Sequence, residues 1–94
     1  MSSYTPGTLT VDRVGPSTWT VALHGEHDLT TTGQLRAELN AIFTQGTTVV
    51  VDFSDATFIE SAVVGELLRA QQRVDRDPTE LLVVVAPPDG APRR

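Results

Sequence analysis

One segment decides the fold: Thr47-Thr48-Val49-Val50-Val51-Asp52. It is followed by residues 53–60 and then by Ser61-Ala62-Val63-Val64. Its run of valines predicts a parallel strand that is covered on both faces of a sheet. Residues 53–60 are expected to form a loop. Apolar residues at helical spacing then predict a helix that begins at Ser61 and ends near Asp75, because Asp77-Pro78 stops it. These apolar residues are Val64, Leu67, Leu68 and Val74.

Ser61 stands at the start of this predicted helix. The first backbone N–H groups of a helix lack partners within the helix, so a serine there usually serves as the N-cap. The same free donors and the positive end of the helix dipole favour a phosphate, which makes Ser61 a candidate phosphoacceptor as well. No neighbouring residue is placed by a local motif to make it a nucleophile, and its surroundings are not a Gly-x-Ser-x-Gly elbow.

The N-terminal part of the chain predicts two further strands. Leu9 and Val11 alternate with polar neighbours, and the same alternation is clearer from residue 18 to residue 23. The apolar positions of the second strand are Trp19, Val21 and Leu23. Residues 14–17 form a short connection that contains Gly and Pro, and so short a connection favours an antiparallel pair.

The first helix is expected to begin close to Thr31. Residues 25–28 are expected to leave the second strand as a turn, and Thr31 with Gln34 matches a capping box. Gly46 is the expected C-terminal stop. The apolar face between these two ends consists of Leu35, Leu39, Ile42 and Phe43.

Leu81 to Val85 is a last apolar strand, so the element order is strand, strand, helix, strand, helix, strand. This order predicts an α/β sandwich with a mixed sheet of about four strands and helices packed on it. Right-handed crossovers would place both helices on the same side if the parallel strands progress in one direction. We expect a single domain over residues 8–86, a disordered N-terminus over residues 1–7 and a Pro-rich tail over residues 87–94.

The composition excludes several classes of function. A net charge of -5 argues against a nucleic-acid or anionic-membrane surface, because phosphates are bound by clustered cations. The absence of cysteine excludes disulfides, thiolate zinc sites and cysteine nucleophiles. No apolar run approaches the ~20 residues of a membrane span, and the N-terminus lacks the layout of a secretory signal, so a cytoplasmic protein is expected.

Two polar clusters are candidates for chemistry. The first has the side chains of a metal site and consists of His24, Glu26, His27 and Asp28. In an extended segment its two histidines project to opposite faces, so a solvated turn is expected instead. The second is Asp52, Asp55 and Glu60, which lacks a Gly-rich cradle with a Lys or Arg and is expected to form caps and turns. No catalytic constellation is found, so we expect neither an enzyme nor a cofactor.

A set of short motifs runs along the chain: Leu23-His24-Gly25-Glu26-His27-Asp28, Thr31 with Leu35, Val49-Val50-Val51-Asp52-Phe53-Ser54, Thr57-Phe58-Ile59-Glu60-Ser61, and Gly65. Together they resemble the STAS domain, which is shared by bacterial anti-sigma factor antagonists and by the cytoplasmic ends of anion transporters. The resemblance runs from about Leu9 to Val85. Its specificity comes from the combination of the Gly-Glu-x-Asp turn with the serine-bearing loop.

The resemblance implies a non-enzymatic regulatory interaction module. In that family an unmodified antagonist binds an anti-sigma factor that is also a serine kinase, and phosphorylation by this kinase switches the antagonist off. The switch segment usually contains Asp-Ser-Ser-Gly or Asp-Ser-Thr-Gly, with the second hydroxyl residue as the acceptor. The matching residues here are Glu60, Ser61, Ala62 and Val63. Because alanine stands at the acceptor position, we expect phospho-switching to be impaired or lost, with Ser61 as the remaining candidate.

The resemblance also places a partner-binding surface at the turn before the first helix and at the start of the second. The residues expected on it are Gly25, Glu26, Asp28, Thr31, Glu60, Ser61, Ala62, Val63 and Gly65. Two alternatives stay open: a module that senses a nucleotide or another anionic ligand, and a soluble subunit of a transport or stress-signalling assembly. The family's final helices are expected to be absent, which would leave an uncovered apolar sheet face suited to a homodimer.

Overall fold

The structure is a computed structural model that describes residues 7–44 and 46–86. The expected disordered N-terminus, apart from Gly7, and the expected Pro-rich tail lie outside these residues. The elements, in chain order, are β1 (Thr8–Gly15), β2 (Thr18–His27), α1 (Leu29–Ile42), β3 (Thr48–Ile59), α2 (Ser61–Val74) and β4 (Leu81–Val85).

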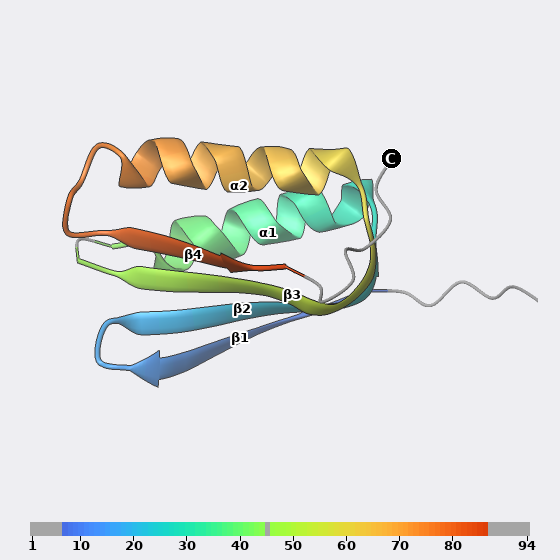
Figure 1. Cartoon of the computed structure of the whole chain (residues 1–94), viewed down its shortest axis with the longest axis horizontal. Helices are drawn as coiled ribbons and strands as arrows, with labels where there is room; N and C mark the ends of the chain where they lie inside the picture. Colours follow the sequence, from blue (N-terminus) through green and yellow to red (C-terminus); the bar gives the residue numbers. More distant parts are fainter. Residues whose placement is uncertain (1–6, 45, 87–94) are drawn as a thin grey trace, which may run out of the picture.

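The strands form one four-stranded sheet in the order β1-β2-β3-β4. β1 and β2 pair antiparallel, whereas β2 with β3 and β3 with β4 pair parallel. Both helices lie on the same side of this sheet, as Figure 1 shows. The predicted α/β sandwich, with its mixed sheet and its element order, is therefore confirmed.

The core lies between the sheet and the two helices. Val49 and Val51 of β3 are fully buried there, whereas Val50 between them is only half-buried. The expectation that this strand is covered on both faces was therefore wrong. Because α1 and α2 occupy the same side, successive side chains of β3 alternate between the core and the open face. The helices complete the core with Leu35, Leu39, Ile42, Val63, Ala70 and Val74.

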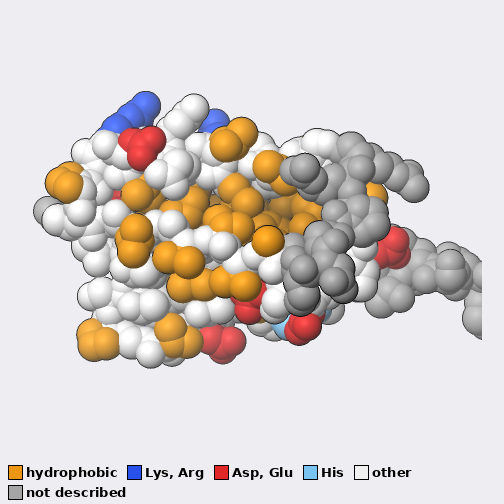
Figure 2. All heavy atoms as spheres, viewed as in Figure 1, with side chains coloured by type: hydrophobic (Ala, Val, Ile, Leu, Met, Phe, Trp, Pro, Cys, Tyr) orange, Lys and Arg blue, Asp and Glu red, His pale blue; other side chains and the backbone are white. Residues whose placement is uncertain are grey.

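The open face of the sheet changes character from one edge to the other. One row of paired residues across it consists of Asp12, Thr20, Val50 and Val83. It is polar at β1 and apolar at β4, so the expected apolar patch does not extend over the whole face. Exposed apolar side chains instead gather on β4, where Leu81, Val83, Val84 and Val85 are all exposed. Figure 2 shows hydrophobic side chains along this edge, between α2 and the sheet.

Two segments that were predicted to be connections, residues 25–28 and residues 53–60, belong largely to strands. β2 continues through Gly25 and Glu26 to His27, and β3 continues through most of the predicted loop to Ile59. The pairing is irregular around residues 22–26, and Gly25 has a φ of 81°, a value that glycine adopts without strain. Buried Ala56 and Ile59 anchor the extension of β3 to the core, which explains why it does not form a loop.

The helix ends also differ from the expected ones. α1 begins at Leu29 because Asp28, not Thr31, is its N-cap: Asp28 Oδ1 accepts a hydrogen bond of 3.0 Å from the backbone N–H of Thr30. α1 ends at Ile42, before Gly46, whose φ of 80° belongs to the following turn. Ser61 is the first residue of α2, and the N-cap position is held by Glu60. The predicted end of α2 and the span of β4 are confirmed.

Candidate functional site

The ends of β2 and β3 bring the two predicted halves of the partner-binding surface together. Gly25 pairs with Ala56, and His27 pairs with Ile59. The backbone N–H of Glu60 then donates a hydrogen bond of 2.8 Å to the carbonyl of His27. Figure 1 shows that both helices start at this same end of the molecule. The starts of α1 and α2 therefore form one continuous surface, which we call the helix-start surface (residues 25–31 and 60–65).

A buried histidine supports this surface from below. His27 is only 1% exposed, and its Nε2 lies 3.0 Å from the carbonyl oxygen of His24. Because a carbonyl only accepts hydrogen bonds, Nε2 carries the proton and Nδ1 accepts from the Thr31 hydroxyl at 2.9 Å. Burial lowers the pKa of His27 below its ordinary value of 6.5. The neutral imidazole thus ties the end of β2 to the first turn of α1.

The start of α2 has no side-chain cap. Glu60 is in an extended conformation, with φ -70° and ψ 144°, and its carboxylate makes no capping hydrogen bond. Ser61 is exposed, and its hydroxyl makes no hydrogen bond to any residue within 7–44 and 46–86. The backbone N–H of Val63 donates to the Glu60 carbonyl at 2.9 Å, and no side chain caps the N–H groups before it. A helix start without a side-chain cap suits an anionic group.

The predicted surface residues divide into accessible and buried ones. Ser61 is exposed. The half-buried residues are Gly25, Glu26, Asp28, Glu60, Ala62 and Gly65. Thr31 is 4% exposed and Val63 is 0% exposed, so these two residues belong to the interior and support the surface instead of contacting a partner directly.

Leu29 is an exposed residue of this surface that the sequence prediction missed. It is 67% exposed and is the first residue of α1, two positions after His27. An exposed leucine beside half-buried polar groups is typical of the centre of an interaction surface. The available signal was Asp28, because recognising it as the N-cap would have placed Leu29 in the first turn and off the apolar face.

Asp52 and Asp55, two members of the predicted acidic cluster, lie in β3 and contact neighbouring residues. Asp52 Oδ1 accepts a hydrogen bond of 2.8 Å from the backbone N–H of Ser54, and hydrogen bonds from Ser54 lower the pKa of Asp52. Asp55 Oδ2 lies 3.2 Å from His24 Nδ1 on the surface. In the described part of the chain, no group of three or more His, Asp and Glu side chains is arranged to hold a metal ion. The same residues contain no helix long and apolar enough to cross a membrane.

Comparison with known proteins links this fold to one family. The family described as "Mlab, STAS domain" matches residues 10–93. A comparison with curated proteins gives no match.

Three solved structures share the fold. The first is the anti-sigma factor antagonist SpoIIAA in its unphosphorylated form, with a TM-score of 0.72 and 24% identity over 82% of this chain and 71% of that chain. The second is an anti-sigma factor antagonist from Mycobacterium paratuberculosis, with a TM-score of 0.67 and 20% identity over 84% of this chain and 68% of that one. The third is an antisigma-factor antagonist STAS domain from Rhodobacter sphaeroides, with a TM-score of 0.59 and 17% identity over 84% of this chain and 85% of that chain.

Proposed function

This chain belongs to the STAS domain family, and we propose that it is a non-enzymatic antagonist of an anti-sigma factor that is also a serine kinase. The likeness to three anti-sigma factor antagonists supports a regulatory role of this kind. The partner binds the helix-start surface in the cytoplasm. The binding releases the sigma factor that the anti-sigma factor would otherwise hold.

The observation that carries this proposal is the joining of the two helix starts. The 2.8 Å hydrogen bond from Glu60 to the His27 carbonyl holds the start of α2 beside the end of β2. Ser61 and the half-buried Ala62 belong to one of the segments that this hydrogen bond joins, and Leu29 belongs to the other; Ser61 and Leu29 are exposed. A partner can therefore contact both helices at once.

Phosphorylation of this surface is impaired or lost, because Ala62 has no hydroxyl at the position where the family's acceptor stands. Ser61 is accessible, but it occupies the position before that acceptor. The kinase that binds the surface is therefore not expected to switch this protein off. Intact-mass measurement after incubation with the candidate kinase and ATP tests this directly. An unchanged mass supports the proposal, whereas a phosphate gained by the wild type and lost in Ser61→Ala would overturn it.

A second candidate function is the sensing of a nucleotide or another anionic ligand at the start of α2. The observation that favours it is the missing side-chain cap at Glu60, which leaves backbone donors available to a phosphate. Calorimetric titration with GTP and ATP tests it, with Ser61→Glu as the variant that places a repelling charge at the same point. Binding that Ser61→Glu abolishes would support this function, and the absence of binding would retire it.

We propose that self-association uses the β4 edge. Leu81 and Val83 to Val85 are exposed there, and the outer side of β4 carries no further strand among the described residues. An exposed apolar edge strand readily pairs with a second copy. Light scattering of the wild type and of Val83→Lys tests this: a dimer that the lysine converts to a monomer supports the proposal, and a monomeric wild type at high concentration contradicts it.

A further inference from the structure

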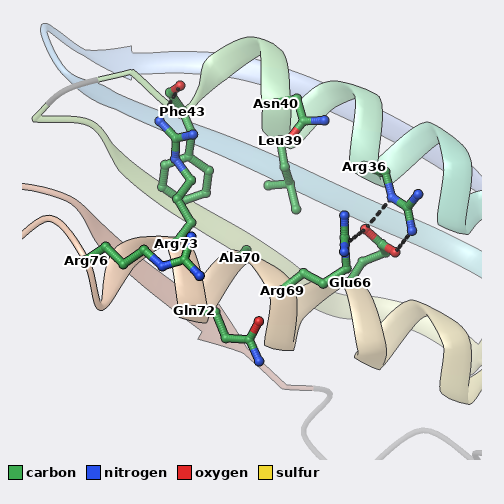
Figure 3. Close-up of a pocket in the computed structure, with 10 residues that line it drawn as sticks. All are labelled: Arg36, Leu39, Asn40, Phe43, Glu66, Arg69, Ala70, Gln72, Arg73 and Arg76. Atoms are coloured by element: carbon green, nitrogen blue, oxygen red, sulfur yellow. Dashed lines mark hydrogen bonds and ion pairs between the residues drawn. The ribbon is translucent and has the colours of Figure 1, made fainter.

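A groove of about 330 Å³ lies between α1 and α2, and arginines dominate its lining. Four of the five arginines in the described residues line it, namely Arg36, Arg69, Arg73 and Arg76. Figure 3 shows Arg36 entering from α1 and the other three from α2 and the turn after it. In a chain of net charge -5, positive charge is thus concentrated in one place.

Two of these arginines are held in position by carboxylates. Arg36 donates to both oxygens of the Glu66 carboxylate, at 3.0 and 2.7 Å. Arg73 donates to Glu80 at 3.2 and 3.1 Å and to the carbonyl of Phe43 at 3.0 Å, and its guanidinium lies 5.4 Å from the Phe43 ring centre. A guanidinium has five N–H donors, so each retains donors that can point into the groove.

The positive charges of the other two arginines, Arg69 and Arg76, are not balanced by carboxylates in the lining of the groove. Arg69 has one ion-pair partner, Glu66, at the long distance of 3.6 Å, and Glu66 is already engaged by Arg36. The Arg76 side chain makes no ion pair or hydrogen bond to a residue within 7–44 and 46–86. Both side chains are exposed. Glu66 is the one carboxylate that lines the groove, so its lining has an excess of positive charge.

We propose that this groove binds a small phosphate-bearing molecule with at least two negative charges, such as a diphosphate. The planar guanidinium fork matches phosphate oxygens and forms two hydrogen bonds at once. The volume lies at the lower end of the range for small-molecule sites and suits a compact ligand. Arg69 and Arg76 supply the charge that holds the phosphates, while Arg36 and Arg73 provide donors that are already oriented.

The groove is distinct from the helix-start surface. Arg69 and Arg73 lie 8 and 12 residues after Ser61 on the same helix, which corresponds to about 12 and 18 Å along its axis. A diphosphate held by Arg69 and Arg73 is too short to reach Ser61 as well. Failure of the anti-sigma factor proposal would therefore leave this inference intact, and the reverse is also true.

Calorimetric titration of the full chain with pyrophosphate, at low salt, is the test. The wild type is expected to bind, and affinity is expected to fall as salt is added, because the pairing is between charges near the surface. The double variant Arg69→Gln/Arg76→Gln is expected to bind at least about tenfold more weakly. Circular dichroism should show an unchanged fold, since both side chains are exposed.

Two control variants separate the groove from other sources of binding. Arg13→Gln removes a positive charge on β1, where Arg13 bonds to the carbonyls of Gly15 and Pro16, and should leave pyrophosphate affinity unchanged. Ser61→Glu adds a negative charge at the start of α2, so its effect on affinity distinguishes binding in the groove from binding at that helix start.

Several results would overturn the proposal. These are no binding by the wild type, equal binding by the Arg69→Gln/Arg76→Gln variant, or a loss of binding in Ser61→Glu that matches the loss in the double variant. Binding of a glutamate-rich peptide in place of pyrophosphate, with the same sensitivity to Arg69 and Arg76, would assign the groove to a protein partner and would equally overturn it.

Discussion

The Nδ1 atom of His27 lies 2.9 Å from the hydroxyl of Thr31, and both side chains are buried beneath the helix-start surface. This contact joins the last residue of β2 to the first turn of α1. The imidazole is neutral, since Nε2 donates to the His24 carbonyl and Nδ1 accepts from Thr31. The position of the surface therefore depends on an imidazole whose pKa burial lowers below the ordinary value of 6.5.

Stability should fall on acidification because the pKa of His27 is lowered by burial. The unfolded state binds a proton at His27 near its ordinary pKa of 6.5, before the folded state does. The stabilisation is thus fully present above that pH and declines as pH falls below it. Urea unfolding between about pH 7.5 and about pH 5 should show this loss, and His27→Gln should flatten it. If the free energy of unfolding changes equally with pH in the wild type and in His27→Gln, the role given to His27 is contradicted. His24→Gln is the matched control.

Replacing Val63 by glycine should cost about 2–4 kcal/mol of unfolding free energy. Val63 is 0% exposed, so the change removes a buried side chain and also weakens the first turn of α2. Gly65→Ala is the control: no atom outside the helix backbone lies within 4 Å of the added Cβ, and the variant should gain up to about 1 kcal/mol. A loss below about 1 kcal/mol for Val63→Gly would show that Val63 is not a core residue.

Shortening the N-cap of α2 should stabilise the protein. Glu60 makes no side-chain cap, and the shorter Asp can reach the N–H groups of the first turn, as Asp28 does at α1. We expect Glu60→Asp to gain about 0.5–1 kcal/mol and Asp28→Ala to lose about 0.5–2 kcal/mol in chemical denaturation. A destabilised Glu60→Asp would mean that the Glu60 carboxylate has a role that the start of α2 does not reveal.

Introducing a hydroxyl at position 62 should restore phosphorylation by the partner kinase. Ala62 is half-buried in the first turn of α2, where free backbone donors and the helix dipole favour a phosphate. Intact mass after incubation with the kinase and ATP should increase by one phosphate for Ala62→Ser and stay unchanged for the wild type. Ala62→Ser/Ser61→Ala should still be modified, and a variant that stays unmodified while binding the kinase would contradict the prediction.

The architecture could be predicted because local patterns determine it. The valines of β3 and the apolar spacing of α2 specify a strand and a helix, and the element order specifies the mixed sheet. The missed parts depend on contacts distant in sequence. The pairing of Gly25 with Ala56 extends both strands, and no local pattern at either residue signals it. Asp28 and Thr31 are both competent caps, and the choice between them depends on whether Thr31 is needed by His27.

The candidate site followed the same rule. The resemblance predicted a partner-binding surface at residues 25–31 and 60–65, and in the structure a backbone hydrogen bond joins these two segments. Burial could not be predicted for Thr31 and Val63, because it depends on how the helices lie on the sheet. The arginine groove was missed for a related reason: Arg36 comes from a different helix than Arg69, and no spacing in the sequence connects them.

The most direct test of the central claim is calorimetric titration of this protein with purified anti-sigma factor kinases from the same genome. The wild type should bind one of them. Ser61→Arg places a long side chain in the helix-start surface and should abolish binding. Gly33→Arg is the matched control, because Gly33 is an exposed position of α1 outside that surface with open space around it, and it should bind like the wild type. Binding by none of the kinases, or equal binding by Ser61→Arg and the wild type, would contradict the account.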